Sequence, residues 1–256
     1  QEFATVKECL KSAVEKYAKN IAFIIKKKKE KDVTYTNITY EQFGKDIRNL
    51  GTSLIDLGLE NKKIAIIGKN SYEWGLTYAA VLSGVGVTVP LDKGLQESET
   101  IVSLQRSKAD AIVFDKEYLE LAKKIRNENN TNLKYFICMD SNEDKDNLYL
   151  YDLIKKGEQE PNDKRFEEHK IDPDAMATLV FTSGTTSKSK AVMLSQNNIA
   201  SNVYSMLLVE DLQPTDSNLA FLPYHHIFGS TCMIVMLAAG IKTAFFNTDT
   251  NNKTTI

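Results

Sequence analysis

The stretch TSGTTSKSK, residues 182–190, lies between two apolar runs that predict strands at 177–181 and 191–194. Six of its nine side chains carry hydroxyl groups, and Gly184 with two lysines completes it. Such a segment can bind a phosphate chain, because hydroxyls and backbone N–H groups donate to the oxygens, glycine lets the backbone approach, and lysine neutralises charge. A polar surface loop has the same composition, so composition alone leaves both interpretations open.

Short apolar strands and amphipathic helices alternate on both sides of this stretch. An apolar helix face runs from Phe43 to Leu57, with a capping box at Thr39 and Gln42 before it and Gly58 after it. Further strands are predicted at 21–25, 33–38, 63–68, 85–90, 111–114, 135–139, 219–222 and 243–246. Further helices are predicted at 71–83, 97–105, 116–127, 196–209 and from residue 227.

This alternation predicts an α/β fold of layered subdomains with mostly parallel sheets, because strands buried on both faces need helices on both. Residues 60–140 are expected to form one α/β layer and residues 175–256 part of a second. The polar segment 140–174 is expected to be a long connection. The strand at 243–246 is expected to lie at an exposed sheet edge.

Charge and cysteine content exclude several classes of protein. The 32 Lys and Arg against 34 Asp and Glu give a net charge of -2, which disfavours a nucleic-acid partner. The three cysteines form no CxxC pair, which argues against a disulfide framework or zinc site and favours a cytoplasmic location. No apolar run is long enough for an integral membrane segment. The lysine run 26–29 is either a basic interaction patch or a solvated hairpin loop, and the acidic Glu30 and Asp32 favour the loop.

The sequence around residues 182–190 resembles the signature of the adenylate-forming superfamily, which includes acyl-CoA synthetases, luciferases and nonribosomal adenylation domains. The family form is close to YTSGTTGxPKGVMLTHxN, and residues 181–198 read FTSGTTSKSKAVMLSQNN. A second family block, LPLFHxxG, is similar to LPYHHIFG at residues 222–229. The chain looks most like an amino-terminal fragment of a bacterial long-chain fatty-acid CoA ligase, covering part of the large AMP-binding domain without the carboxyl-terminal one.

The resemblance implies a role for each matching position. The loop would wrap the β- and γ-phosphates of ATP, and Thr182 would also lie near the Mg²⁺ ion. His226 would line the site of the acyl and adenylate groups, Gly229 would permit close approach at the acyl pocket, and His225 would contact substrate at a position that is often aromatic. No catalytic residue is assigned within these residues. The implied ATP-binding residues are Thr182, Ser183, Gly184, Thr185, Thr186, Ser187 and Lys190.

Three residues depart from the family form, since Ser187, Ser189 and Ala191 replace Gly, Pro and Gly. A serine has less access to positive φ than glycine, and losing proline adds freedom to the unfolded chain. The loop is therefore expected to keep its function with altered mobility.

The implied reaction joins a carboxylic acid, most simply a long-chain fatty acid, to AMP from ATP and then to CoA, with Mg²⁺ as the metal. The fragment alone is expected to be inactive. Two alternatives stay open: an adenylating enzyme for amino or aryl acids, and a non-catalytic nucleotide-binding relative. The acyl chain length and the oligomeric state are not readable, and peripheral contact with a membrane stays open.

Overall fold

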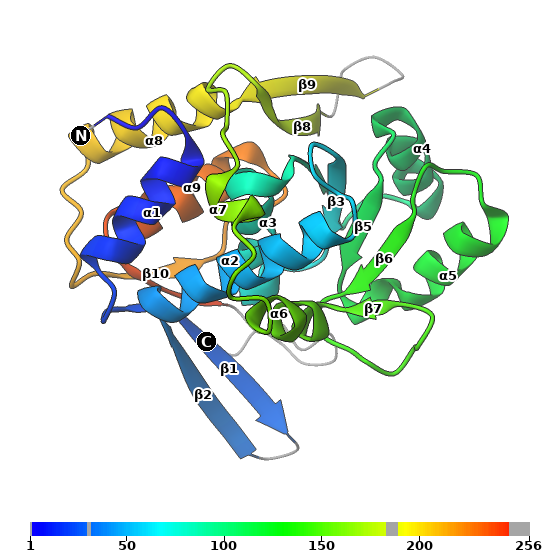
Figure 1. Cartoon of the computed structure of the whole chain (residues 1–256), viewed down its shortest axis with the longest axis horizontal. Coiled ribbons are helices and arrows are strands. Elements are labelled where there is room, and N and C mark those ends of the chain that lie inside the picture. Colours follow the sequence, from blue (N-terminus) through cyan, green and yellow to red (C-terminus); the bar gives the residue numbers. More distant parts are fainter. Residues whose placement is uncertain (1, 30–31, 183–188, 246–256) are drawn as a thin grey trace.

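The computed structural model describes residues 2–29, 32–182 and 189–245, and within them eleven strands form two sheets (Figure 1). The strands are β1 (Ile21–Lys29), β2 (Asp32–Thr39), β3 (Lys63–Ile67), β4 (Val87–Leu91), β5 (Ala111–Phe114), β6 (Tyr135–Cys138), β7 (Leu148–Tyr149), β8 (Met176–Thr182), β9 (Lys190–Ser195), β10 (Ser217–Ala220) and β11 (Lys242–Phe245). The larger sheet has the order β7-β6-β5-β3-β4-β8-β9 and the smaller β10-β11-β1-β2.

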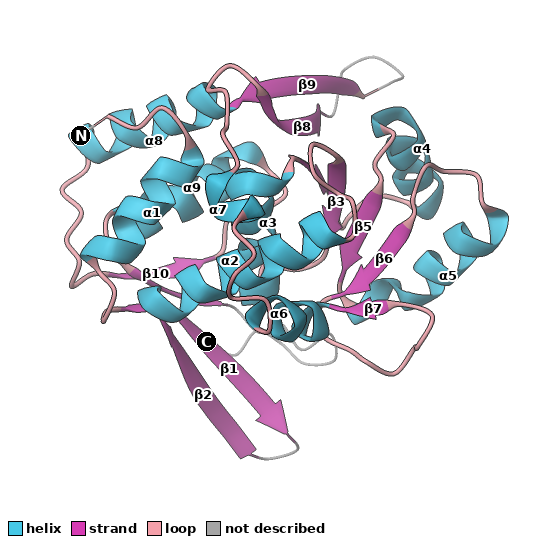
Figure 2. Ribbon diagram, in the orientation of Figure 1, coloured by secondary structure: helices cyan, strands magenta, loops and turns pink. Residues whose placement is uncertain are grey.

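Helices cover the sheets (Figure 2). They are α1 (Val6–Lys16), α2 (Tyr40–Asp56), α3 (Tyr72–Ala80), α4 (Glu97–Ser107), α5 (Leu119–Glu128), α6 (Leu150–Glu158), α7 (Arg165–Glu168), α8 (Gln196–Val209) and α9 (Ile227–Ala238), with a π-helical turn η1 (Val81–Val85) and a 3₁₀ turn η2 (Lys116–Tyr118). The described part of the chain contains no helix that is both long and apolar enough to cross a bilayer.

The larger sheet is buried on both faces. In β3, Ile64 and Ile66 face the larger hydrophobic core, whereas the alternate residues Ala65 and Ile67 face a second core beneath α4 and α5. Since β3 pairs in parallel with both β4 and β5, the prediction of an α/β fold with mostly parallel sheets is confirmed.

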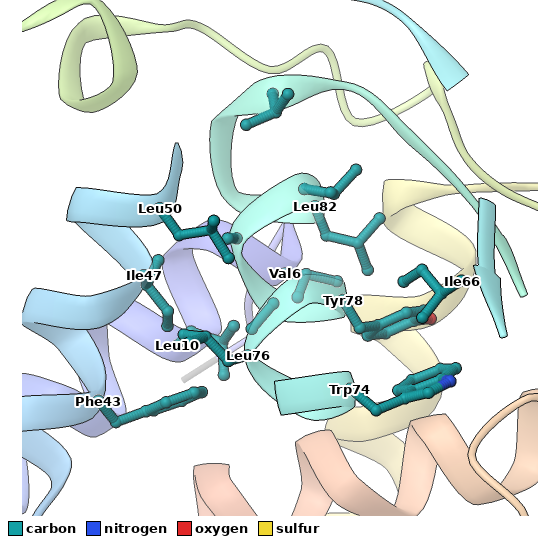
Figure 3. Close-up of a cluster of buried hydrophobic side chains, with 14 of the residues drawn as sticks. Val6, Leu10, Phe43, Ile47, Leu50, Ile66, Trp74, Leu76, Tyr78 and Leu82 are labelled. Carbon is teal, nitrogen blue, oxygen red and sulfur yellow. The ribbon is translucent and has the colours of Figure 1, made fainter. Parts of the chain in front are cut away.

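The larger core gathers side chains from α1, α2, α3 and β3 (Figure 3). Trp74 stacks on Tyr78 at 5.4 Å between ring centroids, and both are fully buried. One half of the predicted capping box of α2 is present, because the Thr39 hydroxyl accepts a hydrogen bond from the Gln42 backbone N–H at 3.2 Å. The Gln42 side chain donates to Asp46 Oδ1 at 2.8 Å instead of returning to the backbone of Thr39. A cap of this kind stabilises a helix by about 1 kcal/mol.

The expectation of a long connection at 140–174 is wrong, because this segment contains β7, α6 and α7. Leu150, Leu153 and Ile154 give α6 an apolar face that is buried in the larger core. Gly157 lies so close to α2 that a Cβ there would be 1.9 Å from the Asn49 carbonyl oxygen. The apolar pattern of α6 is short, and polar residues from its other face interrupt it, so the sequence did not predict this helix. Helix α1 was also missing from the sequence-based expectation.

The strands are grouped differently from the expected layers. Strands β8 and β9 extend the sheet of residues 63–149 instead of joining β10 and β11. Strand β11 is not an edge strand, because it pairs in parallel with β10 on one side and with β1 on the other. Among the described strands of the smaller sheet, the edge positions belong to β10 and β2.

The lysine run is not a loop, because β1 continues through Lys29. The antiparallel ladder with β2 reaches from the Ile21–Thr39 pair to the Lys29–Asp32 pair. Backbone hydrogen bonds along this ladder hold the backbone of residues 26–29 in an extended conformation. The charge pattern of the sequence did not predict this strand.

Candidate active site

The carboxyl edge of the larger sheet brings the two sequence motifs to one side of the molecule. Thr88 of β4 pairs with Thr178 of β8 in parallel register. Asp92 lies four residues after Thr88, and Thr182 lies four residues after Thr178. Both of these residues therefore lie toward the same edge of the sheet, where α/β folds commonly bind ligands.

The paired histidines are tied to this edge through Asp92. Nε2 of His225 lies 3.4 Å from the Asp92 carboxylate oxygen Oδ1. Burial lowers the pKa of His225, and the charge of Asp92 opposes that shift only in part. A half-buried imidazole that stays neutral near pH 7 can accept as well as donate a hydrogen bond.

Asn70 fastens the histidine segment to the end of β3. Its side-chain amide donates hydrogen bonds to the backbone oxygens of Ala220 and Leu222 at 3.0 Å and 2.8 Å. Its side-chain oxygen accepts a hydrogen bond from the Tyr224 N–H at 2.9 Å. Three bonds from one side chain hold the backbone that carries His225 against the larger sheet.

His226 has a structural contact of its own. It is the N-cap of α9, and its Nδ1 accepts a hydrogen bond from the Phe228 N–H at 3.1 Å. In the neutral ring the proton therefore resides on Nε2, which is left to face solvent or a ligand. The residue is exposed.

Gly229 allows the start of α9 to pass close to the preceding turn. A Cβ at this position would lie 2.1 Å from the Pro223 carbonyl oxygen. The chain's own backbone therefore requires glycine here, and the close approach at an acyl pocket that the resemblance implies stays a prediction. Tyr224, in the same turn, is buried against Trp74 with ring centroids 5.4 Å apart.

The structure describes the base of the hydroxyl-rich loop. Thr182 and Lys190 form the last pair of the antiparallel β8–β9 ladder, both exposed, and the Thr182 hydroxyl lies 3.5 Å from the Lys190 carbonyl oxygen. The loop positions Ser183, Gly184, Thr185, Thr186 and Ser187 lie outside the described residues. Strands β8 and β9 are called the signature hairpin below.

Arg106 of α4 supports this base from the side. Its guanidinium lies 5.2 Å from the centre of the Phe181 ring and donates a hydrogen bond to the Ser189 hydroxyl at 3.0 Å. Proline at position 189, as in the family form, has no such acceptor. The departure at Ser189 therefore adds an anchor from α4 in place of the stiffness of proline.

Asp115, which follows β5, has a structural role at the same edge. It is 4% exposed, and its carboxylate accepts hydrogen bonds from the backbone N–H groups of Lys69 at 2.9 Å and Glu117 at 3.1 Å. Burial raises its pKa. Among the described residues, no group of three or more His, Cys, Asp or Glu side chains is arranged to hold a metal ion.

Sequence reasoning missed Asn70, Asp92 and Arg106 as parts of this region. Asn70 and Asp92 each lie two residues beyond a predicted strand, and polar residues near the end of a strand are a signal for a ligand-binding edge. Arg106 gave no signal, because Ser189 lies 83 residues away in the chain.

The described residues define an α/β domain in which the base of the signature hairpin and the histidine segment lie toward the carboxyl edge of a mostly parallel sheet. The family model described as AMP-binding enzyme matches residues 10–256. The chain therefore belongs to the AMP-binding enzyme family.

Relatives and a solved structure agree with this assignment. The chain is 28% identical to fatty acyl-CoA synthetase A of Dictyostelium discoideum over 83% of this chain, and 29% identical to luciferin 4-monooxygenase of Photuris pensylvanica over 84%. It spans 33% and 41% of the lengths of these two relatives. The long-chain-fatty-acid-CoA ligase of Archaeoglobus fulgidus has the same fold, with a TM-score of 0.79 and 18% identity over 94% of this chain and 46% of that one.

Proposed function

We propose that these residues form the ATP- and acid-binding part of an AMP-forming acid–thiol ligase. The observation that carries this proposal is the convergence of the signature hairpin and the histidine segment on one sheet edge. Asp92 follows β4, contacts His225 at 3.4 Å, and lies four residues beyond Thr88, which pairs with Thr178 of the neighbouring strand β8. A long-chain fatty acid is the proposed substrate, in line with the name of the relative from Dictyostelium discoideum.

In the proposed reaction, a carboxylate oxygen attacks the α-phosphorus of ATP and pyrophosphate leaves, which gives an acyl-adenylate. The CoA sulfur then attacks the acyl carbon and AMP leaves. Both steps depend on positioning and on stabilising charge more than on a nucleophile from the protein. This chemistry fits a site that offers hydroxyl groups, a lysine and two imidazoles.

The proposed residue roles are those that the family resemblance implies, and the placement of the described residues supports them. Thr182 and Lys190 stand at the base of the loop, where a hydroxyl and an ammonium group would contact the β- and γ-phosphates together with Ser183, Gly184, Thr185, Thr186 and Ser187. His226 presents Nε2 to the acyl-adenylate, His225 lies beside it, and Gly229 lets the turn close against α9. The Mg²⁺ ion in such sites is held mainly by substrate phosphates and one or two protein oxygens, and Thr182 is suited to supply one.

The proposal is tested first by binding of Mg-ATP to the 256-residue chain, measured by calorimetry. Lys190→Ala is expected to weaken binding by about tenfold, equivalent to about 1.4 kcal/mol, because one charge contact with phosphate is lost. Lys123→Ala removes the same charge from the exposed face of α5 and is the matched control. Absence of binding in the unchanged chain, or equal loss in both variants, would refute the nucleotide site.

Turnover forms a second test. The 256-residue chain by itself is proposed to give no ATP–pyrophosphate exchange. The resembled family has a YGxTE block for adenine contacts and a TGD block for the ribose, and neither string occurs in these 256 residues. In a longer protein that contains this sequence, AMP release is expected to rise with fatty-acid length. Preference for an amino or aryl acid would favour another branch of the family, and binding without AMP release would favour a nucleotide-binding relative.

A further inference from the structure

The outer part of the β1–β2 hairpin extends away from the other described elements (Figures 1 and 2). Strand β1 pairs with β11 only at Phe23 and Ile24 in the described residues, but its ladder with β2 continues to Lys29. We call residues 26–29 and 32–36 the basic arm. All five residues of its β2 side are exposed.

The basic arm has a charge opposite in sign to that of the whole chain. Its residues include four lysines and one aspartate, a net charge of +3, although the whole chain carries -2. A local excess of this kind acts over about a Debye length, which is roughly 8 Å at physiological ionic strength. The arm can therefore attract an anionic surface that the rest of the protein would repel.

Exposed apolar side chains accompany this charge. Val33 is 43% exposed and Tyr35 is 65% exposed, and they lie two residues apart in β2, so they share one face. The ladder pairs Tyr35 with Lys26 and Val33 with Lys28. Tyrosine is enriched at membrane–water interfaces, because its ring is apolar and its hydroxyl is polar.

We propose that the basic arm is the surface by which this protein docks on membranes that contain anionic lipid. Lysines supply the long-range attraction, and Val33 and Tyr35 supply apolar contact at the level of the headgroups. Nucleic acid shares the phosphate chemistry but gains less from an exposed Val–Tyr pair. The proposal does not depend on the proposed enzymatic reaction.

Sedimentation of the 256-residue chain with phosphatidylcholine vesicles, with and without phosphatidylserine, tests the proposal. Binding is expected only with phosphatidylserine and is expected to weaken with salt. The quadruple variant Lys26→Gln, Lys27→Gln, Lys28→Gln and Lys29→Gln is expected to bind about tenfold or more weakly. The control variant changes Lys123, Lys134, Lys155 and Lys170 to Gln, which gives the same net charge from exposed positions on the body. It is expected to stay within about twofold of the unchanged chain.

Two variants at Tyr35 distinguish apolar contact with lipid from electrostatic attraction to any anion. Tyr35→Ser is expected to weaken vesicle binding severalfold at unchanged charge, and Tyr35→Trp is expected to shift its fluorescence to shorter wavelength on phosphatidylserine vesicles. Circular dichroism confirms that each variant is folded. No binding by the unchanged chain, equal loss in both quadruple variants, no effect of Tyr35→Ser, or displacement from vesicles by duplex DNA would overturn the proposal.

Discussion

The signature hairpin and the β1–β2 hairpin are both antiparallel ladders, but they are supported differently. Strand β8 is buried along its middle and pairs with β4 on its other side, so the base of the signature hairpin belongs to the larger sheet. Among the described residues, strand β1 pairs with the body of the protein only near its base, where Ala22 and Phe23 are buried. The same local geometry is therefore part of a buried sheet in one hairpin and carries exposed charge in the other.

The largest effect is expected at the base of β1. Phe23 is fully buried and packs its ring against Phe43 at 5.1 Å and Tyr72 at 5.2 Å. Phe23→Ala should lower the free energy of unfolding by about 3–5 kcal/mol, because it leaves a cavity. Tyr35→Ala, in the basic arm, should change it by less than about 0.5 kcal/mol. Urea unfolding of both variants measures the contrast, and similar losses would show that the arm is not independent of the core.

A smaller effect is expected where β8 meets β4. The Thr178 hydroxyl donates to the Thr88 carbonyl oxygen at 3.3 Å, and the Thr88 hydroxyl lies 3.4 Å from the Ala177 carbonyl oxygen, with both threonines fully buried. Thr178→Val keeps the shape and removes one hydrogen bond, so a loss of about 1–2 kcal/mol in unfolding free energy is expected. Thr36→Val in the arm is the matched control. No loss at residue 178 would mean that strand packing alone holds the hairpin.

The contact of Arg106 with Ser189 should have a smaller effect again, because it is exposed. In a double-mutant cycle with Arg106→Ala and Ser189→Ala, a coupling of about 0.5–1 kcal/mol in Mg-ATP affinity is expected. The double change Ser187→Gly and Ser189→Pro, which restores the family form, should leave ATP affinity within about tenfold, or about 1.4 kcal/mol. Strictly additive effects in the cycle would remove Arg106 as a positioning residue.

The pH dependence of the free energy of unfolding should distinguish the carboxyl edge of the larger sheet, where His225 lies, from the basic arm. Because burial lowers the pKa of His225 below its ordinary value of 6.5, the folded chain binds fewer protons at this ring than the unfolded chain in the window beneath 6.5. Its contribution to stability is present above 6.5 and is lost as the pH falls through that window. His225→Gln should flatten this part of the stability profile.

The Asp92→Asn variant tests the pKa of His225 more directly. Asp92 is the group that raises the pKa of His225, so its removal should lower that pKa further. NMR titration of the imidazole measures the shift directly. A rise in the pKa of His225 in Asp92→Asn would contradict the assigned contact.

Local pattern was sufficient to predict several elements. Helix α8 was predicted with the observed bounds, and the cap of α2 was predicted from Thr39 and Gln42. Helix α6 was missed because its apolar face comprises only a few residues within a charged segment. The sheet to which β8 and β9 belong could not be predicted, because pairing between distant strands leaves no periodic trace in either one.

The chemistry of the site was predicted from residue types, and the sequence by itself determined the α/β class, the hydroxyl-rich loop, the paired histidines and the family resemblance. These depend on side-chain chemistry and on the short periods of helices and strands, which are local properties. Only the tertiary structure decided that Asn70 fixes the histidine segment, that Arg106 contacts Ser189, and that the lysines lie on a projecting arm. These features depend on contacts between residues far apart in the chain, and such contacts are set by how the buried faces pack together.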